Sequence, residues 1–284
     1  MKKVFLLILL LLLLVICFTN SGCTDKKKPV QDSDMLDSAV ARDTVKTDSA
    51  ENLIAQASMP KSADELFDDF IFNFAANKKL QHKRIHFPLS VYRNGKLDHT
   101  IGMDSWKMDH FFMRQDYYTL IFDNRKQMSL VKDTTIDHVI IEKVYFAKKR
   151  VKQYLFNRIN GQWKMTSINY KAMYHNDNAS FLEFYQRFAA DTAFQRRHLA
   201  QNIQFTGPNP DDDFSEMSGV IDASTWPAFA PKLPSHMIYN IIYGQKYTES
   251  TQKIFVIRGI ANSLETELTF RRIHGRWILT KLNT

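Results

Sequence analysis

Residues 156–169 read FNRINGQWKMTSIN, and residues 270–283 read FRRIHGRWILTKLN. Seven of the fourteen positions are identical, and the second stretch begins 114 positions after the first. Asn-Gly at 160–161 is a favoured pair for a two-residue type I′ turn, because both positions take a positive φ. His-Gly at 274–275 occupies the same place in the second stretch. The repeat therefore predicts two copies of one β-hairpin.

The turn also predicts which residues face each other across the hairpin. Arg158 should lie opposite Trp163, and Phe156 opposite Met165. This makes one face apolar and the other polar, which is typical of a sheet with one buried side. The arginine is expected over the indole ring. The matching residues of the second copy are Arg272, Trp277, Phe270 and Leu279.

The same offset recurs in two segments with a helical pattern, 67–81 and 181–195. Their phenylalanines recur at i, i+3 and i+7, which places them on one face of a helix and favours a role in the core. Trp106 and Trp226 lie near the middle of each repeat but six positions out of register, and a loop at 207–213 is the expected source of the shift. Strand-like runs fill the rest of each repeat, at 85–92, 117–122, 138–146, 203–205, 237–243 and 253–257.

Each repeat is therefore predicted to be a long helix packed on an antiparallel sheet. Strands do not alternate with helices, so the fold class is α+β. The period is far longer than the 20–50 residues of solenoid repeats, which predicts two tandem domains. Their expected bounds are 61–173 and 174–284.

The chain begins with a pattern typical of an exported protein. Two lysines precede an unbroken apolar run of 15 residues, 4–18, which has the length of a signal-peptide core and is short for a membrane span. The small residues before Cys23 resemble the bacterial lipobox, in which the cysteine is acylated and becomes the new N-terminus. Asn20 departs from the leucine usual there. We therefore predict a signal peptide at 1–22; an ordinary secretory signal or a short uncleaved anchor is the alternative.

The cysteine count supports a lipid anchor. Cys17 and Cys23 are the only cysteines, so cleavage before Cys23 leaves none for a disulfide. Residues 24–60 contain no aromatic residue and are rich in Asp, Lys, Ser, Thr and Ala, a composition that does not bury enough apolar surface to fold. The stretch 23–60 is therefore predicted to be a lipidated cysteine followed by a flexible tether.

A helix over a curved sheet that ends in a Gly-Trp hairpin resembles the cone of nuclear-transport-factor-2-like (NTF2-like) proteins. With the lipobox and the tether, the chain resembles a lipoprotein family of Bacteroidetes, domain of unknown function 4348. The residues that carry the resemblance are 67–74 with 156–163, and 181–188 with 270–277. The resemblance implies two cone-like domains and a Gram-negative cell envelope. It supplies no catalytic residues.

The search for chemistry yields two histidines as pocket candidates, His110 and His138. General acid–base catalysis needs a group that titrates near neutral pH, and each histidine follows an aspartate. Neighbours on a strand point to opposite faces, so neither pair forms a dyad by itself. No residue is assigned as catalytic. No metal site or cofactor is expected, since no ligand set has a recognised spacing.

Charge indicates the class of partner. The formal net charge is +8, and basic residues form local runs such as 148–152. Such runs favour anionic surfaces, which in an envelope compartment means acidic lipid or glycan and not nucleic acid. The leading hypothesis is a non-enzymatic, lipid-anchored envelope protein that binds a ligand or partner with two cavity-forming domains. The alternatives are an enzyme that acts on a small molecule in one cavity, and a structural component of an outer-membrane assembly.

Overall fold

The computed structural model of the chain describes residues 64–248, 250–261 and 264–284. The predicted signal peptide, the lipidation site Cys23 and the tether lie outside these residues. Within the described part, no helix is long and apolar enough to cross a membrane.

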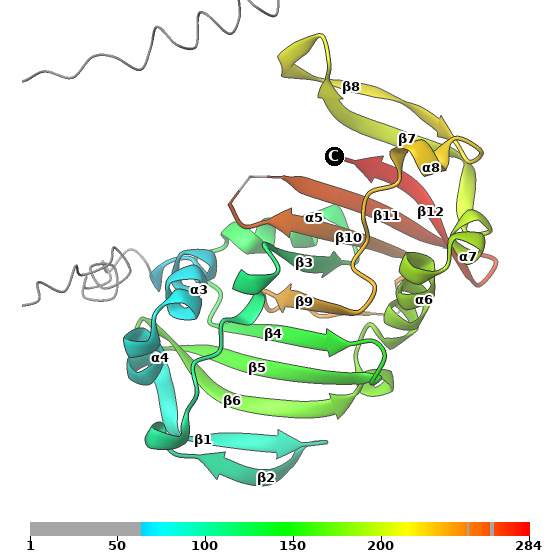
Figure 1. Cartoon of the computed structure of the whole chain (residues 1–284). Helices are drawn as coiled ribbons and strands as arrows, with labels where there is room; N and C mark the ends of the chain where they lie inside the picture. The colour runs from blue at the N-terminus through cyan, green and yellow to red at the C-terminus, as the bar shows by residue number, and fades with distance from the viewer. Residues whose placement is uncertain (1–63, 249, 262–263) are drawn as a thin grey trace, which may run out of the picture. The chain divides into compact units, whose positions relative to one another are not determined.

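Twelve strands form one sheet in the order β2-β1-β6-β5-β4-β9-β3-β10-β11-β12-β7-β8 (Figure 1). The strands of the first repeat are β1 Ile85–Arg93, β2 Lys96–Ile101, β3 Tyr117–Phe122, β4 His138–Tyr145, β5 Arg150–Ile159 and β6 Gln162–Ala172. Those of the second are β7 Leu199–Asn209, β8 Asp212–Asp222, β9 Met237–Ile242, β10 Gln252–Gly259, β11 Glu265–Ile273 and β12 Arg276–Asn283.

The helices are shorter than the sequence pattern predicts. The long helix expected in each repeat is interrupted once, at Asn77 and at Asp191. Each of these side chains caps the helix that follows, accepting from Leu80 N at 3.0 Å and from Phe194 N at 2.9 Å. The α-helices are α3 Phe67–Ala76, α4 Lys78–Arg84, α5 Arg125–Met128, α6 Ala179–Ala190, α7 Thr192–Arg196 and α8 Trp226–Phe229, and the 3₁₀ helices are η2 Met103–Ser105, η3 Phe111–Arg114, η4 Ser129–Lys132 and η5 Met173–His175.

The duplicated hairpin has the predicted register. Arg158 pairs with Trp163 and Arg272 with Trp277, and the guanidinium carbons lie 4.9 and 6.0 Å from the indole centroids. Both turn residues take a positive φ in each copy. The hairpin prediction is therefore confirmed in both repeats.

The sheet is mixed, so the prediction of antiparallel sheets is wrong at three places. β1 pairs parallel with β6, β7 with β12, and β3 with β9. The loop predicted at 207–213 is also wrong, since most of it belongs to the β7–β8 hairpin. Strands β2 and β8 were not predicted, because both are largely exposed and lack apolar alternation.

The two repeats exchange a strand at the centre of the sheet. β4 of the first repeat pairs with β9 of the second, and β10 of the second pairs with β3 of the first. The exchanged strands meet in the middle, at Thr119 and Asn240. The segments 61–173 and 174–284 therefore each contribute one strand to the other's part of the sheet.

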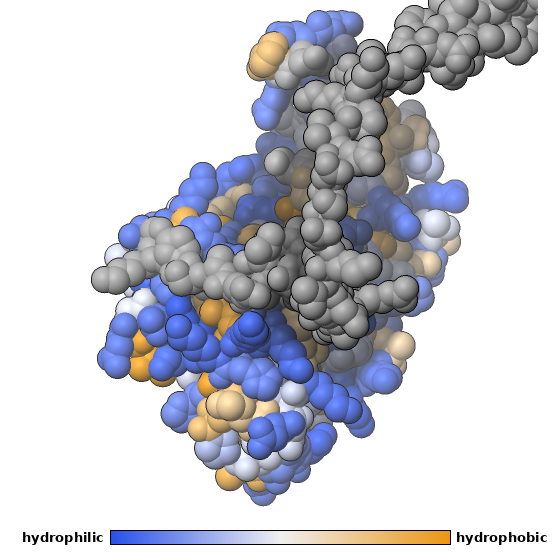
Figure 2. All heavy atoms as spheres, turned by 60° about the vertical axis from the view of Figure 1, so that its left-hand side comes forward, coloured by the Kyte–Doolittle hydropathy of each residue, from blue (hydrophilic) through white to orange (hydrophobic). Residues whose placement is uncertain are grey.

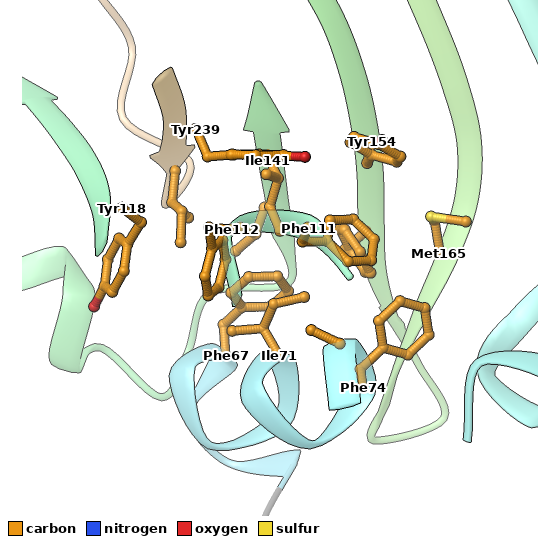
Figure 3. Packing of buried hydrophobic residues seen from close by; sticks show 14 of the residues in the cluster. Phe67, Ile71, Phe74, Phe111, Phe112, Tyr118, Ile141, Tyr154, Met165 and Tyr239 are labelled. Atoms are coloured by element: carbon orange, nitrogen blue, oxygen red, sulfur yellow. The ribbon is translucent and has the colours of Figure 1, made fainter. Parts of the chain in front are cut away.

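The two hydrophobic cores lie on opposite faces of the central strands. On β4, Ile141 belongs to the first core and Val144 to the second. On β9, Tyr239 belongs to the first core and Ile238 to the second. Figure 3 shows α3 pointing Phe67, Ile71 and Phe74 into the first core, where Phe111 and Phe112 of η3 meet them. The phenylalanine faces predicted from the helical spacing are thus buried core.

The two tryptophans that fall out of register have equivalent positions. Trp106 Nε1 donates to Gln81 Oε1 at 3.0 Å, and Trp226 Nε1 donates to Gln195 Oε1 at 2.8 Å. Each glutamine also donates to a carbonyl of the preceding helix. The same tryptophan–glutamine bond therefore ties the middle of each repeat to its helix pair.

Candidate ligand-binding site

Aromatic side chains fill the interior of the first core. The space that a ligand could enter lies at the edge of this core, beside η3. A cavity of about 170 Å³ opens there. Figure 3 shows Tyr154 and Tyr239 on the side of η3 away from α3. The lining residues are Met108, Asp109, His110, Phe111, Arg114, Lys143 and Tyr239.

Gln81 fixes the position of Asp109 in this cavity. Its Nε2 donates to Asp109 O at 2.7 Å, and its Oε1 accepts from Asp109 N at 3.2 Å. Gln81 is fully buried and is itself bonded to Phe74 O and Trp106. The backbone before η3 is therefore anchored at both its donor and its acceptor.

The carboxylate of Asp109 joins η3 to the sheet. Oδ1 accepts from Phe111 N at 2.9 Å, which helps hold Phe111 at a φ of 48°. Oδ2 accepts from the Tyr154 hydroxyl and lies 3.7 Å from Lys152 Nζ. A non-glycine residue at positive φ costs free energy, and such strain concentrates at functional sites.

Beside Asp109, five side chains form a row across five strands: Tyr239 on β9, Lys143 on β4, Lys152 on β5, Tyr170 on β6 and Arg93 on β1. We call it the Tyr–Lys row. Each pairs with its neighbour in the sheet register. Lys143 Nζ lies 4.9 Å from the Tyr239 centroid, Lys152 Nζ 5.8 Å from that of Tyr170, and the Arg93 guanidinium 5.5 Å from Tyr170.

The row places two ammonium groups directly opposite each other, since Lys143 pairs with Lys152. Like charges at such a position destabilise a sheet. Burial lowers the pKa of Lys152, and Lys143 acts in the same direction while Asp109 opposes it. Burial raises the pKa of Tyr239 and of Tyr154, so both hydroxyls stay protonated at neutral pH. The site therefore presents cationic and neutral donors beside aromatic faces.

The second repeat lacks this chemistry. The equivalents of the Tyr–Lys row are Thr119, Ile257, Thr266, Thr284 and Gly207, as the offsets and the sheet register place them. Asp109 is replaced by Phe229 when the two tryptophans are aligned. The scaffold is duplicated but the polar site is not, which is typical of a function added to a structural framework.

Of the two histidines predicted as pocket candidates, the structure brings one to the site. His110 lines the cavity, whereas Nδ1 of His138 bonds Asn157 Oδ1 at 2.8 Å on the neighbouring strand. The Asp109 carboxylate turns toward Tyr154 and Lys152. Among the described residues, the ion pair between a histidine and a carboxylate is His99–Asp98, which lies on exposed β2.

The row is not evident from the sequence alone, where Lys152 belongs to the basic run 148–152. A usable signal was present in the repeat. Lys143, Lys152 and Tyr170 are charged or aromatic in one copy and small or apolar in the other. Differences between the copies mark the site, while identities mark the core.

Comparisons with known proteins show which family the chain belongs to. The model of a domain of unknown function, DUF4348, matches residues 46–284. The chain belongs to the DUF4348 family. It is similar to the crystal structure of an NTF2-like protein from Bacteroides fragilis, with 40% sequence identity and a TM-score of 0.73, over 80% of this chain and 98% of that one. Comparison with the curated proteins finds no match.

These findings confirm the resemblance seen in the sequence and the mixed α and β content. This DUF4348 chain has the NTF2-like fold, which commonly forms ligand-binding cavities. Figure 2 shows the α3 side of the molecule largely covered by hydrophilic residues, with hydrophobic ones in small patches.

Proposed function

We propose that this DUF4348 protein is a cell-envelope lipoprotein that binds an acidic glycan at the Tyr–Lys row, without catalysing a reaction. In this proposal Cys23 carries the lipid, residues 24–60 are the tether, and 61–173 and 174–284 are two cone-like units that share strands. The observation that carries the binding role is the presence of the row in one repeat and its absence from the other.

The chemistry of the row fits a sugar acid. Ammonium groups give charge-assisted hydrogen bonds to carboxylate or sulfate, and these are about twice as strong as neutral ones. Tyrosine rings supply flat apolar faces with a polar tip, which suit a ring that is apolar on one side and hydroxylated at its edge. Lys143 between Tyr145 and Tyr239, at 5.3 and 4.9 Å, offers both features together.

The cost of opposing Lys143 and Lys152 supports a binding role over a structural one. Asp109 neutralises one charge, and Arg114 and His110 add further donors at the cavity. An anion bound between the lysines would relieve their repulsion, so a part of its binding free energy comes from strain already present in the free protein.

The test is the double variant K143Q/K152Q, titrated by calorimetry with a sulfated uronic-acid disaccharide and with its neutral analogue. Each charge-assisted bond contributes about 1.5–3 kcal/mol, so the loss of both should weaken binding at least about 100-fold. The control K78Q/K79Q removes the same charge from exposed lysines of α4 and should change affinity less than about twofold.

Equal weakening by both variants would show only a general charge effect and would overturn the assignment. Binding of phosphatidylglycerol vesicles but not of the disaccharide would identify a lipid surface as the ligand instead. For the anchor, the intact mass of the mature protein should show acylation at Cys23. An unmodified N-terminus elsewhere would remove that part of the proposal.

A further inference from the structure

A second cavity, of about 250 Å³, lies at the start of α6 in the second repeat. It is built against the second core, on the face of the central strands opposite the first core. The segment after β9, the start of β10 and the β11–β12 hairpin complete its walls. It is therefore distinct from the Tyr–Lys row.

A buried ammonium group lies in this cavity. The Lys253 side chain is 4% exposed, and its Nζ donates to Asp123 and, at 2.7 Å, to Asn178 Oδ1. An ammonium has three N–H donors, so one is left beyond these two bonds, and the Nζ lies 4.9 Å from the ring centroid of Tyr247. Asp123 offsets its charge, and the exposed Asp177 lies on the rim.

Trp277 adds a donor that lacks a partner. Its side chain lines the cavity and is 6% exposed, and its Nε1 has no acceptor among the described residues. A buried donor without an acceptor costs about 1–3 kcal/mol. Trp163 Nε1 of the first repeat likewise has no acceptor among the described residues, so both copies share this feature. In the second copy, the tryptophan lines a cavity.

The N-terminus of α6 adds further N–H donors beside this cavity. α6 has 12 residues, and Asn178 at its N-cap makes no side-chain cap bond. The first N–H of the helical ladder is that of Leu182, which donates to Asn178 O. The N–H groups of Ser180 and Phe181 have no acceptor within the helix, and the helix dipole adds positive potential there.

The first repeat shows what this position accommodates. Asp64 stands where the second repeat has Asn178, and its carboxylate accepts from Trp163 N at 3.1 Å and from both Nη atoms of Arg84. Arg158 closes over it with bonds to the carbonyls of Asp64, Glu65 and Thr134. The protein's own carboxylate fills the start of the first helix pair.

The second repeat has lost both the carboxylate and the closing arginine contacts. Asn178 and His198 replace Asp64 and Arg84. Arg272, the counterpart of Arg158, is exposed and bonds Gly275 O at 3.4 Å. Of the donors that Asp64 satisfies in the first repeat, the guanidinium of Arg84 is lost. Lys253, whose counterpart in the first repeat is Val139, is a cationic donor that only the second repeat has at this register position.

We propose that the cavity at the start of α6 binds an oxyanion group of a ligand, a carboxylate, phosphate or sulfate. The anion lies beside Asn178 and supplies the negative charge that Asp64 carries at the twin position of the first repeat. Lys253, the Trp277 indole and the N-terminal N–H groups of α6 hold it from within, and Arg272 closes over it from the rim.

The test uses the full chain in detergent, labelled with ¹⁵N at tryptophan. The sequence has four tryptophans, so four indole N–H signals can be followed. Phosphate, sulfate and acetate, each against chloride at equal ionic strength, should shift the Trp277 signal saturably and leave that of Trp163 in place. Which oxyanion binds tightest identifies the ligand group.

Two variants and a matched control make the assignment specific. R272Q should weaken the titration about tenfold, while R271Q, the same change on the next residue of β11, should not. N178D should abolish the titration without lowering the melting temperature, because it restores the internal carboxylate of the first repeat. K143Q/K152Q should leave the Trp277 titration unchanged, which separates this site from the Tyr–Lys row.

The proposal is overturned if no oxyanion moves the Trp277 signal beyond the effect of chloride. It is also overturned if R272Q and R271Q weaken the titration equally, or if N178D binds as well as the unmodified chain.

Discussion

Replacing Asp64 by Asn should destabilise the protein by about 3–5 kcal/mol, because the change leaves a buried guanidinium without its counter-ion. The side chains of Arg84 and Asp64 are 5% and 8% exposed, and two bonds of 2.8 and 2.7 Å join them. Arg84 also donates to Trp163 O at 3.2 Å. An amide has one acceptor oxygen to offer where the carboxylate offers two.

Urea unfolding followed by tryptophan fluorescence measures the loss. For a folded region of this size, a destabilisation of this magnitude corresponds to a fall of about 6–20 °C in Tm. The control is D98N. The Arg93–Asp98 pair is 55% and 35% exposed, so its loss should leave stability unchanged within error.

The second repeat supplies a compensating change. Asn178 and His198 occupy the positions of Asp64 and Arg84, so D64N/R84H installs the Asn–His pair that the second repeat already accommodates. The double variant should be at least about 2 kcal/mol more stable than the sum of the two single changes predicts. Additive losses, or a D64N loss below about 1 kcal/mol, would refute the reasoning that an unpaired buried charge dominates.

Two further predictions concern the centre of the sheet. Burial raises the pKa of Glu142 above its ordinary 4.5, so the folded state keeps a proton that the unfolded state loses. Stability should therefore fall as pH rises from 4.5 through the raised pKa, and E142Q should flatten this part of a Tm profile measured from pH 4 to 9. A chain that ends at residue 173 should not fold alone, because β4 loses β9. Circular dichroism should detect folding when the 174–284 fragment is added. A folded 61–173 fragment would contradict the strand exchange.

Local features could be predicted from the sequence because they depend on near neighbours. The Asn-Gly turn at 160–161 fixes the register of its hairpin, and the spacing of Phe67 and its partners fixes one face of α3. Both outcomes follow from a few residues of chain. The break at Asn77 was missed because a capping side chain and a helix-interior one look alike in a short polar stretch.

The strand exchange could not be predicted, for a physical reason. β3 and β9 read YYTLIF and MIYNII, and five of six residues in each are buried. A strand buried on both faces has no alternation to specify its neighbours. The sequence pattern therefore does not decide whether β4 pairs with β3 or with β9, nor which of the two pairs with β10. The pairing depends on connections across the whole molecule.

The binding candidates were hard to find because they depend on residues far apart in the chain. Asp109 and Lys152 meet through Gln81, which fixes the backbone before η3. His110 was singled out by its residue type, and it lines the cavity without a bond to the adjacent carboxylate. Residue type alone did not identify the groups that give the cavity its charge.

The two repeats differ at twin positions in a complementary way. The first fills the start of its helix pair with Asp64 and Arg84 and places lysines at the rim, whereas the second leaves the start of α6 open and has Ile257 and Thr266 at the rim. Each repeat thus retains one polar site. Coupling between sites requires an element with two arrangements. The strands between these two are buried and paired on both sides, so we expect the two sites to bind independently.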